Sequence, residues 1–268
     1  MTFDLGPALL FCPADRPERF GKAIERSDAI ILDLEDAVLP EAKASARRNV
    51  IDADLDPDRV IVRVNAPDSE AFAADLEALA QTSFRTVMVA KTENPGSLAA
   101  FDERYALIAL CETARGIHAA PAIAAHPQVS AMMWGAEDLV ASLGGTSSRD
   151  ETGAYREIAR YARSRVLLEA GAHGKAAIDA VHIDLDDVAG LAREAVDAAA
   201  SGFRASACIH PNQVAAIRAA YRPDDATIDW ARKVLAAAAG ERGVFRFEGR
   251  MIDEPVLRHA RSIVSRAG

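Results

Sequence analysis

The sequence predicts an α/β protein folded as a (β/α)8 TIM barrel with a C-terminal helical extension. Three observations lead to this fold class. Short apolar runs alternate with longer stretches of helical character, eight such pairs fill most of the chain, and several runs are apolar throughout, as strands buried on both faces are. An open doubly wound sheet is the alternative, but no G-x-G-x-x-G turn favours its dinucleotide-binding version.

The eight expected strands are short segments rich in Val, Ile, Leu and Ala. In chain order they cover residues 8–12, 29–34, 59–65, 86–91, 106–112, 129–135, 176–181 and 205–210. Because parallel strands need a crossover between them, each is expected to be followed by a helix on the outside of the barrel.

The expected helices lie between these strands. Two open with a proline, Pro17 and Pro40, at a first helical position where a missing N–H is tolerated. A third begins at Ser69 as a cap and places Phe72 and Leu76 on one face. The remaining helices are expected at 97–103, 114–125, 153–171, 187–200 and 211–220.

The segment after the eighth strand–helix pair is not needed to close a barrel. We expect residues 1–222 to form the barrel and residues 223–268 to form a C-terminal extension of the same domain, beginning with a helix through about residue 239.

The composition excludes several classes of function. The net charge is −9 and no basic cluster stands out, so a nucleic-acid partner is not expected. No apolar stretch is long enough to span a bilayer, and the first residues, MTFDLGPALLF, lack the pattern of a secretory signal. Cys12, Cys111 and Cys208 lie far apart in apolar runs, which is typical of buried reduced thiols in a cytoplasmic protein.

Charged residues gather where the expected strands end. The run IILDLEDAV passes from apolar residues directly to Asp33, Glu35 and Asp36. The other strand ends supply Asp15, Arg16, Arg63, Asn65, Lys91, Glu112, Glu137, Asp138, Asp179, His182 and His210. Since the loops after barrel strands build the active site, these groups are expected around one mouth. Carboxylate oxygens there suit Mg²⁺, and the histidines and cysteines lack zinc-site spacing.

Several of these residues also have simpler interpretations. Lys91 would serve as a solvated cap, and His182 and His210 as structural histidines. Arg63 lies inside VIVRVN, so it needs an anion, either a protein carboxylate or a substrate carboxylate; we favour the substrate. Spacing alone leaves open whether the acid after strand six that binds metal is the first or the second of the pair in GAEDL.

Seven motifs together resemble one family. LLFCPADRPERFGKA, AIILDLEDAV, VIVRVNA, ALCETARGI, MMWGAEDLVASLGG, CIHPNQV and GRMIDEPVLRHA occur in this order from about residue 9 to 260. They are similar to the citrate lyase β-subunit-like branch of the HpcH/HpaI aldolase superfamily, and in particular to its stand-alone CoA-thioester lyases.

The resemblance implies a barrel that uses Mg²⁺ to cleave a carbon–carbon bond through a thioester enolate. It assigns the metal to Glu112 and Asp138, with Glu112 also next to the substrate, and makes Arg63 the substrate-binding and catalytic arginine. Glu35 and Asp36 then lie beside the metal, where they hold its waters or orient Arg63.

The resemblance also concerns the two ends of the chain. The family binds CoA or a carrier near the first loop, which here offers Arg16 and Lys22 to the phosphates. Its C-terminal segment, here 223–268, is a lid that reaches the mouth of a neighbouring subunit in a homotrimer and brings an aspartate as acid or base, here Asp253.

The predicted function is therefore that of a cytoplasmic Mg²⁺-dependent lyase. Its substrate is a 3-hydroxyacyl-CoA thioester of the malyl-, citramalyl- or 3-hydroxy-3-methylglutaryl-CoA type, and its products are an acyl-CoA thioester and a small oxo-acid. Two alternatives are a β subunit of a multi-subunit citrate lyase acting on a carrier-bound citryl group, and a CoA-independent class II aldolase. The second is disfavoured because strand two ends in acids without the early catalytic histidine of those relatives.

Overall fold

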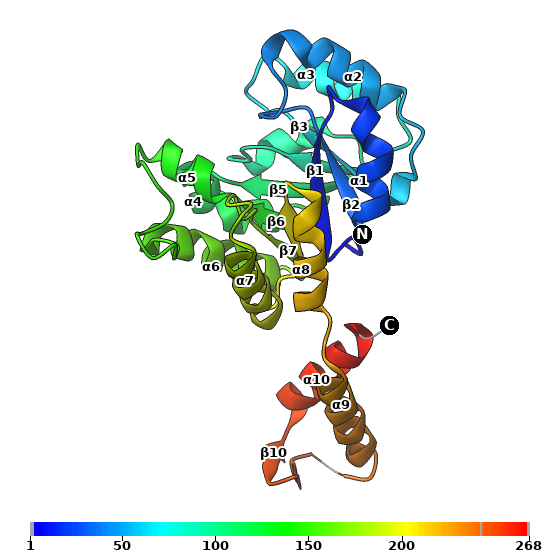
Figure 1. Cartoon of the computed structure of the whole chain (residues 1–268), viewed down its shortest axis with the longest axis vertical. Helices are drawn as coiled ribbons and strands as arrows, with labels where there is room; N and C mark the ends of the chain where they lie inside the picture. Colours follow the sequence, from blue (N-terminus) through cyan, green and yellow to red (C-terminus); the bar gives the residue numbers. More distant parts are fainter. Residues whose placement is uncertain (1–2, 242, 267–268) are drawn as a thin grey trace. The chain divides into compact units, whose positions relative to one another are not determined.

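The computed structural model describes residues 3–241 and 243–266. Eight parallel strands form a closed barrel in chain order, with β1 paired to both β2 and β8 (Figure 1). The strands are β1 (Ala8–Pro13), β2 (Ala29–Asp33), β3 (Val60–Val64), β4 (Thr86–Val89), β5 (Ala106–Cys111), β6 (Val129–Trp134), β7 (Ala176–Asp179) and β8 (Ala205–Cys208). The predicted (β/α)8 barrel is confirmed.

One apolar cluster receives residues from all eight strands, so it fills the interior of the barrel. Its strand members are Leu9, Ala29, Ile31, Ile61, Met88, Ile108, Leu110, Ala131, Met133, Ile178, Ala205 and Ala207. Phe3, from the segment before β1, packs against the same cluster. Within a strand these residues alternate with residues that face the helices, as the period of two requires.

The same alternation decides which polar side chains point into the mouth. Asp33 and Arg63 lie two residues beyond the interior residues of β2 and β3, and Glu112 lies two residues beyond Leu110, just past the end of β5. All three side chains therefore continue the inward-facing rows at the carboxyl ends of these strands. The alternation of side chains along the strands therefore places these charged groups around one opening of the barrel.

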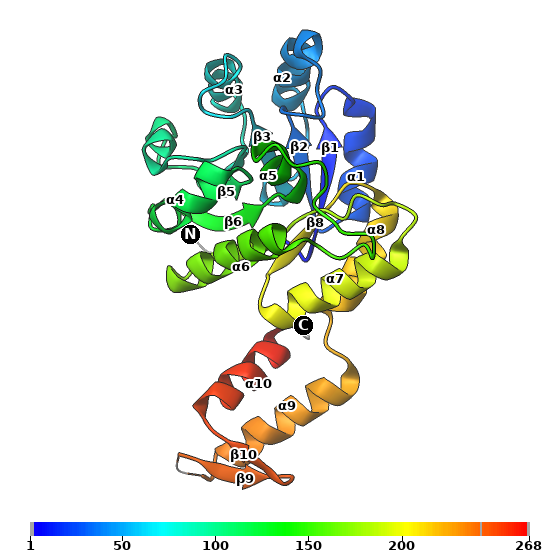
Figure 2. The ribbon, with the colours of Figure 1, turned by 90° about the vertical axis from the view of Figure 1, so that its left-hand side faces the viewer.

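The helices lie outside the strands (Figures 1 and 2). Those of the barrel are α1 (Phe20–Arg26), α2 (Lys43–Ile51), α3 (Phe72–Leu79), α4 (Ala114–Ala124), α5 (Ala136–Ser142), α6 (Glu157–Ala172), α7 (Val188–Ser201) and α8 (Pro211–Tyr221). Short 3-10 turns precede α1, α2 and β3 at Pro17–Arg19, Pro40–Ala42 and Pro57–Arg59.

Three helix predictions need correction. The helix expected at 97–103 is a 3-10 helix, η4 (Pro95–Ala100), because Asn94 caps a segment that opens with Pro95 and Gly96 and is too short for an α-helix. The short helix α5 was not expected, because its acidic start, AEDL, was interpreted only as the end of a strand. The helix expected to begin at residue 153 begins at Glu157.

The C-terminal part of the chain forms a second compact unit, which begins at Arg218, and the barrel unit ends at Ile217. It contains α9 (Asp225–Ala238), the hairpin strands β9 (Phe245–Phe247) and β10 (Arg250–Ile252), and α10 (Glu254–Arg266). Figure 2 shows α9 and α10 side by side, and they share a core of Ala231, Val234, Ile252, Leu257, Ala260 and Ile263. That residues 223–268 belong to the same domain as the barrel stays a prediction.

Two further expectations concern the whole chain. Cys12, Cys111 and Cys208 are all buried, as expected for structural thiols. In the described part of the chain, no helix combines the length and the apolar character that crossing a membrane requires.

Candidate active site

A cavity of about 190 Å³ opens at the carboxyl ends of the barrel strands. Its charged lining consists of Asp33, Arg63, Glu112, Glu137 and Asp138. Its apolar lining includes Phe11, Leu110, Met133, Val181 and Ile209. A small buried space with convergent charges on one side and apolar groups on the other is the usual form of a small-molecule site.

Asp33 fixes the orientation of the Arg63 side chain. The two residues are register partners on β2 and β3, so their inward-facing side chains meet. Nε and Nη2 of Arg63 donate to the two oxygens of Asp33, each over 2.7 Å. Asp33 is 1% exposed and also accepts from the backbone N–H groups of Glu35 and Ala37, which fixes the loop after β2. Burial opposes the charge of Arg63, but Asp33 outweighs it and raises the Arg63 pKa.

The other acids after β2 share a lysine. Nζ of Lys91 contacts the carboxylate of Glu35 and lies 3.0 Å from Oδ2 of Asp36. Glu35 is buried, and its Oε2 lies 3.2 Å from Nη1 of Arg63. Burial raises the pKa of Glu35, against the opposing charges of Arg63 and Lys91. Partial burial acts in the same direction on Asp36, but the hydrogen bond and charge of Lys91 outweigh it and lower the pKa of Asp36.

Glu112 is the more deeply buried acid of the predicted metal pair, at 3% exposed. Burial, together with the charge of Asp138, raises the pKa of Glu112 to about 8. The backbone N–H of Lys91 donates to its Oε1 over 3.0 Å. Gly135 leaves the space that the side chain occupies, since a Cβ there would lie 2.8 Å from both Cβ and Oε2 of Glu112. The protein alone therefore disfavours the ionised form of Glu112, and a bound cation would stabilise it.

The two acids at the start of α5 are in different situations. Oε1 of Glu137 accepts a hydrogen bond from the hydroxyl of Ser148 over 2.5 Å, which ties Glu137 to the loop after α5. Oδ1 of Asp138 lies 3.3 Å from Nζ of Lys91 and its side chain is 35% exposed. Asp138 is thus the freer of the two, in agreement with the choice that the family resemblance implied.

The residues of the mouth fit a hard divalent cation. Glu112 and Asp138 offer oxygen ligands only, and a cation between them would relieve the penalty on the charge of Glu112. Among residues 3–241 and 243–266, no group of three or more His, Cys, Asp or Glu side chains could hold a metal. Mg²⁺ keeps several waters, so two carboxylates with water or substrate oxygens in the remaining coordination positions suit it. A structural zinc site would instead need four protein ligands.

Three predicted residues lie apart from this cluster. Arg16 and Lys22 are exposed in the segment that follows β1, and Nε of Arg16 lies 3.9 Å from Oδ1 of Asp15. Asp253 belongs to the C-terminal unit, where its Oδ1 caps α10 by accepting from the N–H of Val256 over 3.2 Å. The roles of these three residues, and the ligand roles of Glu112 and Asp138, stay predictions.

Sequence reasoning undervalued two residues of the mouth. Asp33 was counted among the acids but given no role, although its parity with Ile31 on β2 already placed it inside the barrel. The sequence suggests a solvated cap for Lys91, whereas it is half-buried and contacts acids that follow both β2 and β6. The left-handed backbone that turns Lys91 toward them leaves no signal in the sequence.

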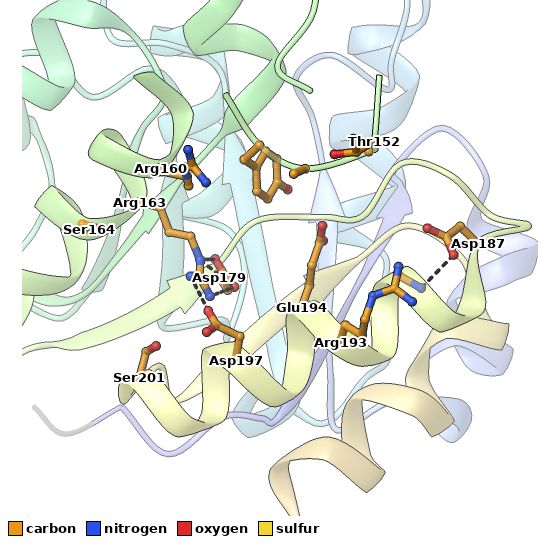
Figure 3. Close-up of a pocket in the computed structure, with 14 residues that line it drawn as sticks. Thr152, Arg160, Arg163, Ser164, Asp179, Asp187, Arg193, Glu194, Asp197 and Ser201 are labelled. Atoms are coloured by element: carbon orange, nitrogen blue, oxygen red, sulfur yellow. Dashed lines mark hydrogen bonds and ion pairs between the residues drawn. The ribbon is translucent and has the colours of Figure 1, made fainter. Parts of the chain in front are cut away.

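A larger cavity, of about 560 Å³, lies between α6 and α7 (Figure 3). Figure 3 shows Arg163 of α6 reaching both Asp179, at the end of β7, and Asp197 of α7. Oδ1 of Asp179 also accepts from the indole N–H of Trp134, over 2.6 Å, and Trp134 lines the cavity of the mouth. The ion pairs of Arg163 in the wall of this second cavity therefore support the end of β6.

The family model for HpcH/HpaI aldolase/citrate lyase matches residues 8–211, which span the barrel. The chain belongs to this family. It is 54% identical to the citrate lyase subunit beta-like protein of Mycobacterium tuberculosis over 98% of this chain and 96% of that protein. It is 33% identical to the human mitochondrial citramalyl-CoA lyase over 97% of this chain and 85% of that one.

A solved structure extends the family relationship to the whole fold. A crystal structure of protein CitE from M. tuberculosis, in complex with magnesium, acetoacetate and coenzyme A, superposes with a TM-score of 0.93 at 53% identity and covers 99% of both chains. The predicted family is confirmed, and so is the prediction that the protein is an enzyme of the lyase class.

Proposed function

We propose that the protein cleaves a 3-hydroxyacyl-CoA thioester to an acyl-CoA and a small oxo-acid. The observation that carries this proposal is the convergence of Glu112, Asp138 and Arg63 on one cavity of about 190 Å³. A cavity of this size accommodates the oxo-acid portion of the substrate, so CoA must extend outward from the mouth. Support comes from the M. tuberculosis CitE complex, which contains magnesium, acetoacetate and coenzyme A.

Magnesium is the metal of this enzyme, as predicted, and the comparisons confirm it. Glu112 and Asp138 would hold it. When bound, it supplies positive charge that polarises the oxygens of the hydroxy or oxo acid and stabilises negative charge as it develops. Glu112 is buried and Asp138 is partly exposed, so a cation held by the pair would be screened by water on one side only.

Arg63 retains donors for the substrate. A guanidinium carries five N–H groups; Asp33 accepts from two of them, and Glu35 faces Nη1 at 3.2 Å. The remaining N–H groups of Nη1 and Nη2 are available to the cavity that Arg63 lines. Arg63 can thus bind a substrate carboxylate or an enolate oxygen while Asp33 keeps its fork in a fixed orientation.

The bond changes need one base and one acid. A carboxylate takes the proton of the substrate hydroxyl, the carbon–carbon bond breaks, and the hydroxyl carbon becomes the carbonyl of the oxo-acid. The electron pair of that bond passes to the thioester as an enolate, and an acid then protonates its carbon. We assign one of these proton transfers to Asp253 of a neighbouring subunit, in a homotrimer.

The C-terminal hairpin supports this arrangement. Met251 of β10 is 68% exposed and Val244, just before β9, is 63% exposed. Two exposed apolar side chains on a hairpin that leads directly to Asp253 suit a surface that packs against another subunit. A lid of this kind would exclude water from the enolate when the thioester is bound.

The apolar wall of the cavity favours a methyl-bearing oxo-acid unit. Phe11, Leu110, Met133, Val181 and Ile209 line the cavity, and Arg63 is the cation among its lining residues. One carboxylate and one small apolar substituent match these groups better than two carboxylates do. The substrate is therefore of the citramalyl- or 3-hydroxy-3-methylglutaryl-CoA type, since each of these carries one carboxylate and one methyl group. Arg16 and Lys22 are assigned to the CoA phosphates.

A thioester panel tests this proposal. Citramalyl-, malyl- and 3-hydroxy-3-methylglutaryl-CoA are incubated with enzyme and Mg²⁺, and products are identified by mass spectrometry. We expect oxo-acid and acyl-CoA in equal amounts, with kcat/KM at least ~10-fold higher for citramalyl-CoA than for malyl-CoA, the effect of one buried methyl group. Release of free CoA, or turnover only of a carrier-bound citryl group, would contradict the proposal.

A further inference from the structure

Lys91 contacts three acids that follow two different strands, β2 and β6. Its Nζ contacts Glu35, lies 3.0 Å from Oδ2 of Asp36 and lies 3.3 Å from Oδ1 of Asp138. Its side chain is 28% exposed, so these contacts are only partly open to water. A single ammonium thus connects the end of β2 with the start of α5 across the mouth.

The backbone of Lys91 contributes a separate contact. Lys91 follows β4 with a φ of 47°, a left-handed conformation that costs a non-glycine residue free energy. In this conformation its N–H donates to Oε1 of Glu112 over 3.0 Å. A bulky residue keeps such a strained backbone conformation only when surrounding contacts impose it. Residues of this kind are concentrated at functional sites.

We infer that Lys91 is a positioning residue for the lyase reaction: its ammonium sets the orientation of Glu35 and Asp36, and its backbone N–H sets that of Glu112. The inference rests on the proposed function. It adds a residue that acts through neighbouring acids and does not itself contact the substrate.

The physical reason is charge balance. Asp33, Glu35, Asp36, Glu112 and Asp138 place five carboxylates around one opening. Arg63 is engaged by Asp33 and Glu35, on the side of β2 and β3. Lys91 is the cation that faces Asp36 and Asp138, so without it these acids would repel one another into other rotamers. Misplacement of acids around a bound cation and substrate lowers the rate more than it lowers binding.

Two substitutions separate the side chain from the backbone. Lys91→Met removes the ammonium and keeps the strained backbone, whereas Lys91→Gly removes the ammonium and relaxes the backbone. We expect kcat for the best thioester of the panel to fall ~10-fold to ~100-fold in both variants, with KM within about 3-fold of wild type. Lys175→Met is the matched control, because Lys175 precedes β7 at the opposite end of the barrel; its kcat should be unchanged.

A double-mutant cycle gives a readout that does not depend on activity. In the metal-free protein we expect Lys91→Met to lower Tm by about 4 °C, and by only about 2 °C when Glu35→Gln is already present, because the ion pair with Glu35 is then absent while those with Asp36 and Asp138 remain. Wild-type kcat in Lys91→Gly, or an equal Tm loss in both backgrounds, would overturn the inference. If the wild type cleaves no thioester, the proposed function fails, while the cycle still decides whether Lys91 holds Glu35.

Discussion

Asp33 and Arg63 are joined by two hydrogen bonds of 2.7 Å each, between register partners on adjacent strands. The sequence predicts that Arg63 needs an anion, and in the structure a protein carboxylate already binds two of its N–H groups; its contact with a substrate stays a prediction. This anchor leaves N–H groups directed to the cavity and restricts the guanidinium to one orientation. A group fixed before the substrate arrives needs little reorganisation in the transition state.

Arg63→Lys should lower kcat/KM by at least ~10²-fold. Lysine keeps the positive charge but has no planar fork to satisfy both oxygens of Asp33 and the substrate together. Loss of one transition-state donor typically costs ~10²-fold to ~10³-fold. Steady-state kinetics with the preferred thioester measures this effect. Near-normal kinetics would mean that Arg63 serves only as the ion-pair partner of Asp33.

Gly135→Ala should weaken Mg²⁺ binding by at least ~10-fold. The added Cβ would lie 2.8 Å from Cβ and Oε2 of Glu112, so Glu112 would have to move. Isothermal titration with Mg²⁺ measures the change. The control is Gly171→Ala in α6, where nothing lies within 4 Å of the new Cβ; it should leave Mg²⁺ affinity unchanged. Equal affinities in the two variants would show that Glu112 does not need its present position to bind metal.

The affinity for Mg²⁺ should rise with pH. In the metal-free barrel the Glu112 pKa is about 8, so the carboxyl is mostly protonated at neutral pH. Mg²⁺ needs the carboxylate, so binding releases a proton, and affinity should increase up to ~10-fold per unit as pH rises toward 8 and level off above it. Titrations across this range in buffers of different ionisation enthalpy measure both quantities. A flat pH profile with no proton release would exclude Glu112 as a ligand.

The fold and the inward direction of the site side chains could be predicted from the sequence, because both follow from the alternation of side chains along each strand. Arg63 and Glu112 continue interior rows that can be recognised from apolar residues two positions earlier. The Asp33–Arg63 pair depends on strand register, which the alternation does not specify. The contacts of Lys91 depend on one left-handed residue after β4. Such long-range and backbone features arise only when the strands are assembled.

Asp253 should act on the site of a neighbouring subunit. Asp253→Asn is the informative substitution, because asparagine can keep the α10 cap, Oδ1 to the N–H of Val256, while it removes the charge. Asp253→Asn and Glu112→Gln subunits, each inactive alone, are mixed under conditions of subunit exchange. In trans, roughly a quarter of the sites in an equal mixture combine both intact residues, since each residue is intact in half of the subunits. An inactive mixture, with exchange verified by native mass spectrometry, would contradict a shared site.

The central claim is that Glu112 and Asp138 hold the magnesium, and the most direct test compares neighbouring acids. Mg²⁺ titrations are performed on Glu112→Gln, Asp138→Asn and Glu137→Gln; the last removes a carboxylate that Ser148 already engages. We expect Mg²⁺ binding to be lost in the first two variants, each still folded, and to persist in Glu137→Gln within about 3-fold of wild type, since removal of a supporting group costs less than removal of a ligand. Loss of binding in Glu137→Gln with unchanged affinity in Asp138→Asn would contradict the account.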